Sequence, residues 1–259
     1  MITEMDRHEI REYCRILHLH AFAENFEAFS KEQTGCQEYL LSLLRAQNDE
    51  KNQNGVEKRI RAAKFPYRKY LDDLELDCLP QGMRSRLPEL MTLDFIKEGR
   101  NVLLTGNPGT GKTHTAIGLG IKACEAGYKV LFTTVPYLVT ELKESHDQQK
   151  LMAYERKFLK YDLVIADELG YVSFDREGAD LLFNNLSQRV GLKSTIITSN
   201  LSFKEWEKIF GDPAITGAMV DRLTFGAILV DMQGDSYRLR ETLRVNQIDK
   251  SYVMEGKDD

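Results

Sequence analysis

The sequence predicts an α/β fold in which helices cover both faces of a parallel sheet, with a small all-α domain ahead of it. Four short apolar runs have the composition of buried strands, at residues 101–105, 129–134, 161–166 and 194–199. Helical segments separate these runs, and strands that alternate with helices form parallel sheets. A glycine-rich loop follows the first run and two acidic residues follow the third. Ligands bind at the carboxyl ends of strands in such sheets, so we expect a site there.

The region before the sheet is expected to be helical. Apolar residues recur at helical spacing over residues 7–30, and a second helix after Thr34-Gly35 carries a polar tail that closes at Gly55. A third helix is expected from Val56 to about residue 64, because Pro66 disfavours helix in the residue before it. We therefore expect a helical domain over residues 1–70, a nucleotide-binding domain over residues 71–250 and a loose tail over residues 251–259.

The composition narrows the class of protein. The chain has 259 residues, 42% hydrophobic and 29% charged, as is ordinary for a globular protein. Its net charge of −5 means that any nucleic-acid surface must be local. The cysteines are widely spaced, which favours neither a zinc site nor disulfides. These cysteines fit a reducing, cytoplasmic setting. No apolar run is long enough to cross a membrane, so we expect no membrane partner.

The glycine-rich loop reads G-x-x-x-x-G-K-T, the phosphate-binding P-loop pattern. A β-prone run precedes it and a proline-free helical segment, residues 114–126, follows it, which is the context that the pattern requires. Glycines let backbone N–H groups turn toward phosphate oxygens, and the helix N-terminus adds positive partial charge. Lys112 can reach the β- and γ-phosphates, and Thr113 offers a hydroxyl to Mg²⁺. The predicted nucleoside triphosphate site comprises Gly106, Asn107, Pro108, Gly109, Thr110, Gly111, Lys112 and Thr113.

Polar residues that follow the later strands supply the chemistry of hydrolysis. Asp167 would hold Mg²⁺, and Glu168 would polarise the water that attacks the γ-phosphate. Asn200 closes the run at residues 195–199, where its amide would place that water or cap the next helix. Arg222 is too far along the chain to be assigned by spacing, and by itself pairs equally well with Asp221.

A sharply bounded basic cluster precedes the sheet. Residues 56–70 carry six basic side chains and one acid, with two tyrosines among them. Two interpretations explain this pattern equally well: a surface that contacts nucleic-acid phosphates, or a solvated helix face. The basic residues are Lys58, Arg59, Arg61, Lys64, Arg68 and Lys69. A second basic stretch lies between Lys143 and Lys160, where a solvated helix is the favoured interpretation.

With these residues assembled, the chain resembles the AAA+ ATPases of the DnaC helicase-loader and IstB transposition-helper group. The shared motifs are GNPGTGKTH at 106–114, DELGY at 167–171, DREGADLLF at 175–183 and TSNL at 198–201. Motifs closer to the IstB branch are AAKFP at 62–66, FKEW at 203–206, FGDP at 210–213, DRL at 221–223 and SYRLRE at 236–241. The resemblance covers about residues 60–242.

The resemblance implies a role for each remaining residue. ATP with Mg²⁺ would lie along the loop that ends in His114, and Asn200 would be the first sensor. Arg222 would be an arginine finger reaching the site of the adjacent subunit of a homo-oligomer, and Arg238 would contact the γ-phosphate within its own subunit. The helical insert after the second strand would face DNA, and the lid would be reduced. Ala166 departs from the larger aliphatic residue usual there, but alanine suits a buried strand.

The leading hypothesis is an ATPase that oligomerises on duplex DNA and hands a target to a cognate transposase. The alternative is a replicative helicase loader of the DnaC type, which would act on a helicase ring and single-stranded DNA. A nucleoside kinase is disfavoured, because Asp167-Glu168 and an arginine acting from another subunit suit attack by water.

Overall fold

The computed structural model describes residues 4–32 and 35–246, and the expected tail at residues 251–259 lies outside the described residues. The chain forms two compact units, residues 1–58 and 59–259. The boundary lies before the expected one at residue 70, because the intervening segment packs on the second unit. The Phe132 N–H donates to the Ala63 carbonyl at 2.8 Å, and the rings of Phe65 and Phe132 are 6.2 Å apart.

The first unit is helical, as predicted, but its helices are divided differently. It contains α1 (Glu4–Ile16), α2 (His20–Glu32) and most of α3 (Cys36–Ala62). The single helix expected over residues 7–30 is wrong, because His18 turns the chain with a φ of 56° between α1 and α2. The break expected at Gly55 is also wrong. One interior glycine costs a helix about 1 kcal/mol, and the 27-residue α3 continues through it.

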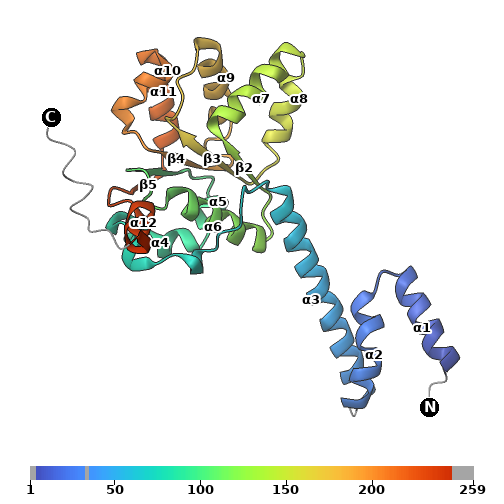
Figure 1. The fold of residues 1–259 in the computed structure, drawn as a ribbon. Coiled ribbons are helices and arrows are strands. Elements are labelled where there is room, and N and C mark those ends of the chain that lie inside the picture. Colours follow the sequence, from blue (N-terminus) through green and yellow to red (C-terminus); the bar gives the residue numbers. More distant parts are fainter. Residues whose placement is uncertain (1–3, 33–34, 247–259) are drawn as a thin grey trace. The chain divides into compact units, whose positions relative to one another are not determined.

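The second unit is built on a five-stranded sheet with the order β2-β3-β4-β1-β5, and every pair of neighbours is parallel (Figure 1). The strands are β1 (Val102–Thr105), β2 (Val130–Thr134), β3 (Leu163–Leu169), β4 (Ser194–Ser199) and β5 (Ile228–Asp231). The four predicted strands are confirmed. The sequence analysis missed β5, an edge strand whose apolar run, residues 227–230, is only four residues long.

Helices cover both faces of the sheet, as predicted (Figure 1). One layer contains α4 (Gln81–Met91) and α6 (Lys112–Glu125), and the other contains α7 (Val135–Asp147), α9 (Arg176–Ser187) and α11 (Pro213–Thr224). The other α-helices are α5 (Asp94–Lys97), α8 (Leu151–Phe158), α10 (Glu207–Phe210) and α12 (Tyr237–Asn246). Short 3₁₀ turns are η1 (Leu71–Asp73), η2 (Leu76–Cys78) and η3 (Phe203–Glu205). Within the described residues α12 alone follows β5, in agreement with the reduced lid.

Aspartate side chains cap the first turns of two of these helices, α9 and α11. Asp175 accepts a hydrogen bond from the Gly178 N–H at the start of α9, and Asp212 accepts from the Ala214 and Ile215 N–H groups at the start of α11. Such caps satisfy donors that a helix leaves unpaired. In the part of the chain that the structure describes, no helix is both long and apolar enough to cross a lipid bilayer.

The insert between β2 and β3 is helical, as expected, and consists of α7 and α8. Gln149, with a φ of 58°, lies in the turn between the end of α7 and the start of α8. A buried arginine from the end of α9 holds the insert. The Arg189 guanidinium donates to the carbonyls of Phe158 at 2.9 Å, Tyr161 at 3.1 Å and Ser194 at 2.9 Å. It thereby joins the end of α8 to β4.

We expect Arg189→Met to lower the unfolding free energy of the second unit by on the order of 3 kcal/mol, because three buried carbonyls lose their donors. Urea denaturation followed by fluorescence of Trp206, the single tryptophan, measures it. Arg176→Met, at an exposed position on α9, is the matched control and should change stability by less than about 0.5 kcal/mol. Equal stability of the two variants would contradict the assigned role of Arg189.

Candidate nucleotide-binding site

The loop between β1 and α6 adopts a conformation that its glycines permit. Gly106, Gly109 and Gly111 have φ values of 151°, 81° and 91°. A Cβ atom on Gly106 would collide with the backbone of Met232, and one on Gly109 would collide with the Ser236 side chain. The loop is therefore packed against the segment that follows β5, and other residues at these positions would push the two apart.

Lys112 lies inside this loop. Its Nζ donates to the carbonyls of Gly106 and Asn107, both at 2.7 Å. Burial lowers the pKa of Lys112 to about 8, a shift that the carboxylate of Asp167 opposes and the guanidinium of Arg238 reinforces. These two carbonyls hold the ammonium group inside the loop, where it would meet the phosphates of a nucleotide bound there.

Asp167 is a buried carboxylate held by two hydroxyl groups. Thr113 Oγ1 donates to its Oδ1 at 3.0 Å and Oδ2 at 3.2 Å, and Thr198 Oγ1 donates to Oδ1 at 2.6 Å. Burial raises the pKa of Asp167, whereas these two hydrogen bonds oppose that shift. The carboxylate and the Thr113 hydroxyl form an all-oxygen donor set, which fits Mg²⁺.

Glu168 and Asn200 line a cavity beside the loop, together with Lys112 and Thr113. Glu168 has a φ of 66°, in the left-handed region that few residues other than glycine adopt. Its N–H donates to Thr198 Oγ1 at 3.0 Å. The Asn200 Oδ1 atom is buried and has no hydrogen-bond partner among the described residues. This arrangement provides a carboxylate and an unpartnered amide oxygen beside the loop.

The cavity has a volume of about 310 Å³, and elements far apart in the sequence form its walls. Lys112 and Arg238 both line it, as do loop residues 108–114. His114 Nε2 lies 3.0 Å from the Tyr70 carbonyl, which brings the start of α6 to the segment that precedes η1. The sequence analysis missed several lining residues: Tyr67, Lys69 (assigned there to DNA), Leu74, Leu79, Tyr171, Thr198 and Tyr237. The sequence analysis noted the tyrosines at 67 and 70 within the basic cluster, but the sequence does not show that they lie near the loop.

Arg222 does not line this cavity. It is exposed on α11, and its guanidinium carbon lies 4.9 Å from the centre of the Phe183 ring. The described part of this chain thus brings Arg238, but not Arg222, to the nucleotide site.

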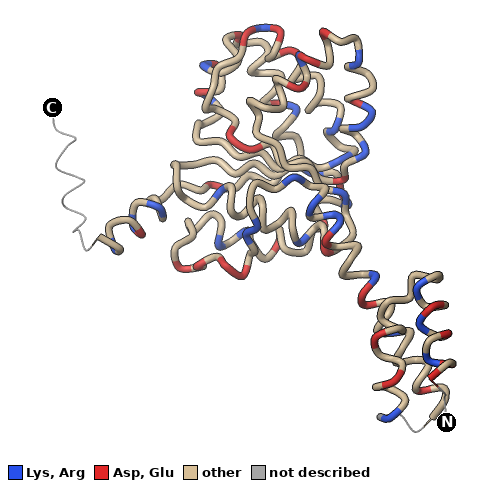
Figure 2. Tube along the Cα trace, turned by 45° about the vertical axis from the view of Figure 1, so that its right-hand side comes forward, with Lys and Arg blue, Asp and Glu red and all other residues tan. Residues whose placement is uncertain are grey.

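The basic cluster is divided by the structure. Lys58 ends the first unit, whereas the other members belong to the second. Arg59 Nε donates to the Cys124 carbonyl at 2.7 Å, and Lys69 lines the nucleotide cavity. The remaining members are exposed: Lys58, Arg61, Lys64 and Arg68. Basic and acidic residues are interspersed over the rest of the second unit (Figure 2).

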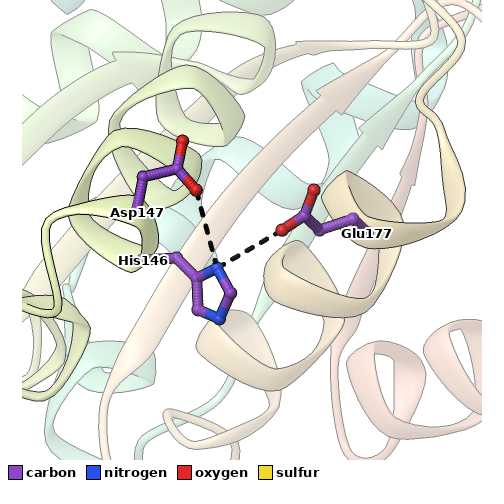
Figure 3. Close-up of side chains that lie close together, drawn as sticks. All are labelled: His146, Asp147 and Glu177. Atoms are coloured by element: carbon purple, nitrogen blue, oxygen red, sulfur yellow. Dashed lines mark ion pairs between the residues drawn. The ribbon is translucent and has the colours of Figure 1, made fainter.

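A separate group of ionisable residues joins the end of α7 to the start of α9 (Figure 3). His146 Nδ1 lies 3.3 Å from Glu177 Oε1 and 3.9 Å from Asp147 Oδ1. All three side chains are exposed, and the sequence analysis did not single them out. The group lies outside the nucleotide cavity, and its members pair with one another as surface charges do.

We expect the free protein to bind a nucleoside triphosphate about tenfold more weakly at pH 9 than at pH 7. Because the pKa of Lys112 is lowered to about 8, its ammonium is charged below that pH and loses its proton as the pH rises through it. Titration of a fluorescent ATP analogue in EDTA measures Kd. Lys112→Arg is the control and should remove this pH dependence, because a guanidinium stays charged. A flat profile for the parent protein would contradict the assignment.

Solved AAA+ structures share this fold. The chain of DnaA from Aquifex aeolicus, solved with AMPPCP, matches with a TM-score of 0.53 and 18% identity over 73% of this chain and 60% of that chain. The chain of DnaI matches with a TM-score of 0.53 and 22% identity over 65% of this chain and 90% of that one. At this identity the similarity concerns the fold alone. The second unit therefore has the fold of these DnaA and DnaI chains.

Sequence relatives are much closer. A protein of insertion sequence IS5376 from Geobacillus stearothermophilus, described as ATP-binding, is 39% identical over 91% of this chain and 95% of its own length. A protein of insertion sequence IS21 from Pseudomonas aeruginosa, also described as ATP-binding, is 34% identical over 87% of this chain and 85% of its own. The family model described as IstB-like ATP binding protein matches residues 14–245. This chain belongs to the IstB-like ATP-binding protein family.

Proposed function

We propose that this protein is an ATPase that oligomerises on duplex DNA and assists a transposase in selecting a target. The observation that carries the ATPase part is that Glu168, Lys112 and Asn200 line one cavity, whose Thr113 hydroxyl donates to the buried Asp167 carboxylate. The family's occurrence in insertion sequences supports the transposition part.

In this proposal the residues of the cavity divide the work of hydrolysis. Lys112 holds the β- and γ-phosphates, and Glu168 accepts the proton of the attacking water. Asn200, whose Oδ1 has no partner among the described residues, orients that water. Thr113 and Asp167 hold Mg²⁺, which neutralises charge on the phosphate oxygens when it is bound.

Two arginines complete the proposed site from different subunits. Arg238 lines the cavity of its own chain and is placed to contact the γ-phosphate. Arg222 is exposed and lies outside that cavity, which suits a finger that enters the site of an adjacent subunit. Hydrolysis then requires a homo-oligomer, and assembly controls the rate.

The proposed DNA surface contains fewer residues than the basic cluster. Arg59 already donates to a backbone carbonyl, and Lys69 lines the nucleotide cavity. We therefore assign neither residue to contact with DNA phosphates. Lys58, Arg61 and Lys64 are exposed, and each is a preferred candidate for contact with DNA phosphates. Exposed bases at the end of the insert form the competing surface: Arg156, Lys157 and Lys160. The helicase-loader alternative is supported by the motifs shared with the DnaC group, at residues 106–114, 167–171, 175–183 and 198–201.

We expect Arg222→Ala and Glu168→Gln proteins each to lose on the order of 10³ in turnover, and their equal mixture to recover about a quarter of parental turnover. Random assembly pairs an intact Glu168 with an intact Arg222 at about that fraction of interfaces. Phosphate release measures it.

The matched control mixes Lys112→Ala with Glu168→Gln. Both changes damage the same subunit's site, so no interface is complete and the mixture should stay inactive. Arg222 would lack a role between subunits if its mixture stayed inactive in oligomers shown to exchange subunits.

We expect the triple variant Lys58→Glu, Arg61→Glu, Lys64→Glu to bind a random duplex of about 50 base pairs on the order of 100-fold more weakly than the parent, with ATP affinity unchanged. The slope of log K against log salt should become shallower by about 0.9 for each phosphate that the variant no longer neutralises. Sequence preference should be weak, because these side chains contact phosphates. Fluorescence anisotropy with ATP present measures both quantities.

The control for that experiment carries the same change of charge elsewhere: Arg156→Glu, Lys157→Glu, Lys160→Glu. It should bind the duplex within about threefold of the parent. If this control loses binding while the first variant keeps it, the end of the insert is the DNA surface. If neither loses binding, duplex DNA is not held by either group of bases.

A further inference from the structure

The two acidic residues of the site occupy an irregularity in the sheet. Along β3 and β4, Ala166 pairs with Ile197 and Leu169 pairs with Ser199, so the register shifts between these pairs. Asp167 and Glu168 therefore lie opposite one residue, Thr198. This is the two-against-one count of a β-bulge, a device that redirects side chains beside active sites.

One hydroxyl group at this bulge contacts both acidic residues. Thr198 Oγ1 donates to Asp167 Oδ1 at 2.6 Å and accepts from the Glu168 N–H at 3.0 Å. A hydroxyl has one proton to donate and can accept at the same time, so these bonds use both of its capacities. Thr198 is 2% exposed.

The bond to the Glu168 N–H stabilises an uncommon backbone. Glu168 has a φ of 66°, and a residue with a Cβ atom adopts that conformation only when its surroundings hold it there. At the bulge the N–H leaves the regular ladder, and the Thr198 hydroxyl becomes its acceptor. The direction in which the Glu168 carboxylate leaves the strand depends on this backbone, and so on Thr198.

We propose that Thr198 is a positioning residue for hydrolysis, whose hydroxyl sets the Glu168 carboxylate against the attacking water while it anchors Asp167. This inference rests on the proposed hydrolysis at Glu168 and adds a residue to it. Thr198 acts through the two acidic residues, so its loss affects turnover far more than ATP binding. This role depends on the hydroxyl of Thr198 and does not depend on its β-branched shape.

The test compares Thr198→Val, which keeps the shape and removes the hydroxyl, with Thr198→Ser, which keeps the hydroxyl. We expect Val to lower kcat about 10- to 100-fold, with KM and Kd for ATP within about threefold of the parent, and Ser to restore most of kcat. Thr195→Val is the matched control, because Thr195 is a buried threonine on the same strand that contacts Arg189 and neither acid. It should keep kcat within about threefold, even if its thermal midpoint falls.

A second variant pair tests whether Thr198 acts through Glu168. In a Glu168→Gln background, Thr198→Val should cause little further loss, because the carboxylate that it positions is gone. If Thr198→Val does not fold, Thr198→Ala gives the same comparison with a smaller side chain.

The outcomes separate this inference from the function on which it rests. If Glu168→Gln keeps turnover, the proposed hydrolysis itself is wrong. If Glu168→Gln loses turnover while Thr198→Val keeps kcat, or Val lowers kcat and Ser does not restore it, the role of the Thr198 hydroxyl is overturned. An equal loss in Thr195→Val and Thr198→Val would also overturn it, since both would then report on strand stability.

Discussion

The buried carboxylate of Asp167 is the constraint around which the site is organised. A charge at this depth is unfavourable unless hydrogen bonds compensate it, and the hydroxyls of Thr113 and Thr198 provide them. One hydroxyl comes from the first turn of α6, where the P-loop ends, and the other from β4. The carboxylate thereby fixes the loop, β3 and β4 relative to one another, and Glu168 follows it on a backbone that this arrangement holds.

The second constraint is the close approach of the P-loop to the chain that follows β5. Gly106 and Gly109 leave no room for a Cβ atom beside Met232 and Ser236. The Tyr237 N–H donates to the Gly109 carbonyl at 3.0 Å, so α12 begins against the loop itself. Arg238 is consequently placed at the wall of the cavity that Lys112 also lines, although the reduced lid supplies only one helix in the described part of the chain.

The same lid helix also contacts the segment before the sheet. The Tyr237 hydroxyl donates to Glu75 Oε1 at 3.0 Å, and Arg240 donates to the Cys78 thiol at 3.1 Å. The cavity is therefore enclosed by residues from both ends of the second unit, with the P-loop between them.

The sequence by itself determined the parallel sheet, the P-loop and the acidic pair, because each depends on local patterns: apolar runs, glycine spacing and a charge at a strand end. It did not determine β5, whose four residues are buried on one face only. Nor did it show that Arg59 bonds to a carbonyl of α6, that Lys69 lines the cavity, or that Thr198 faces the acidic pair. Those facts depend on which segments meet, and only the packing of the whole unit decides that.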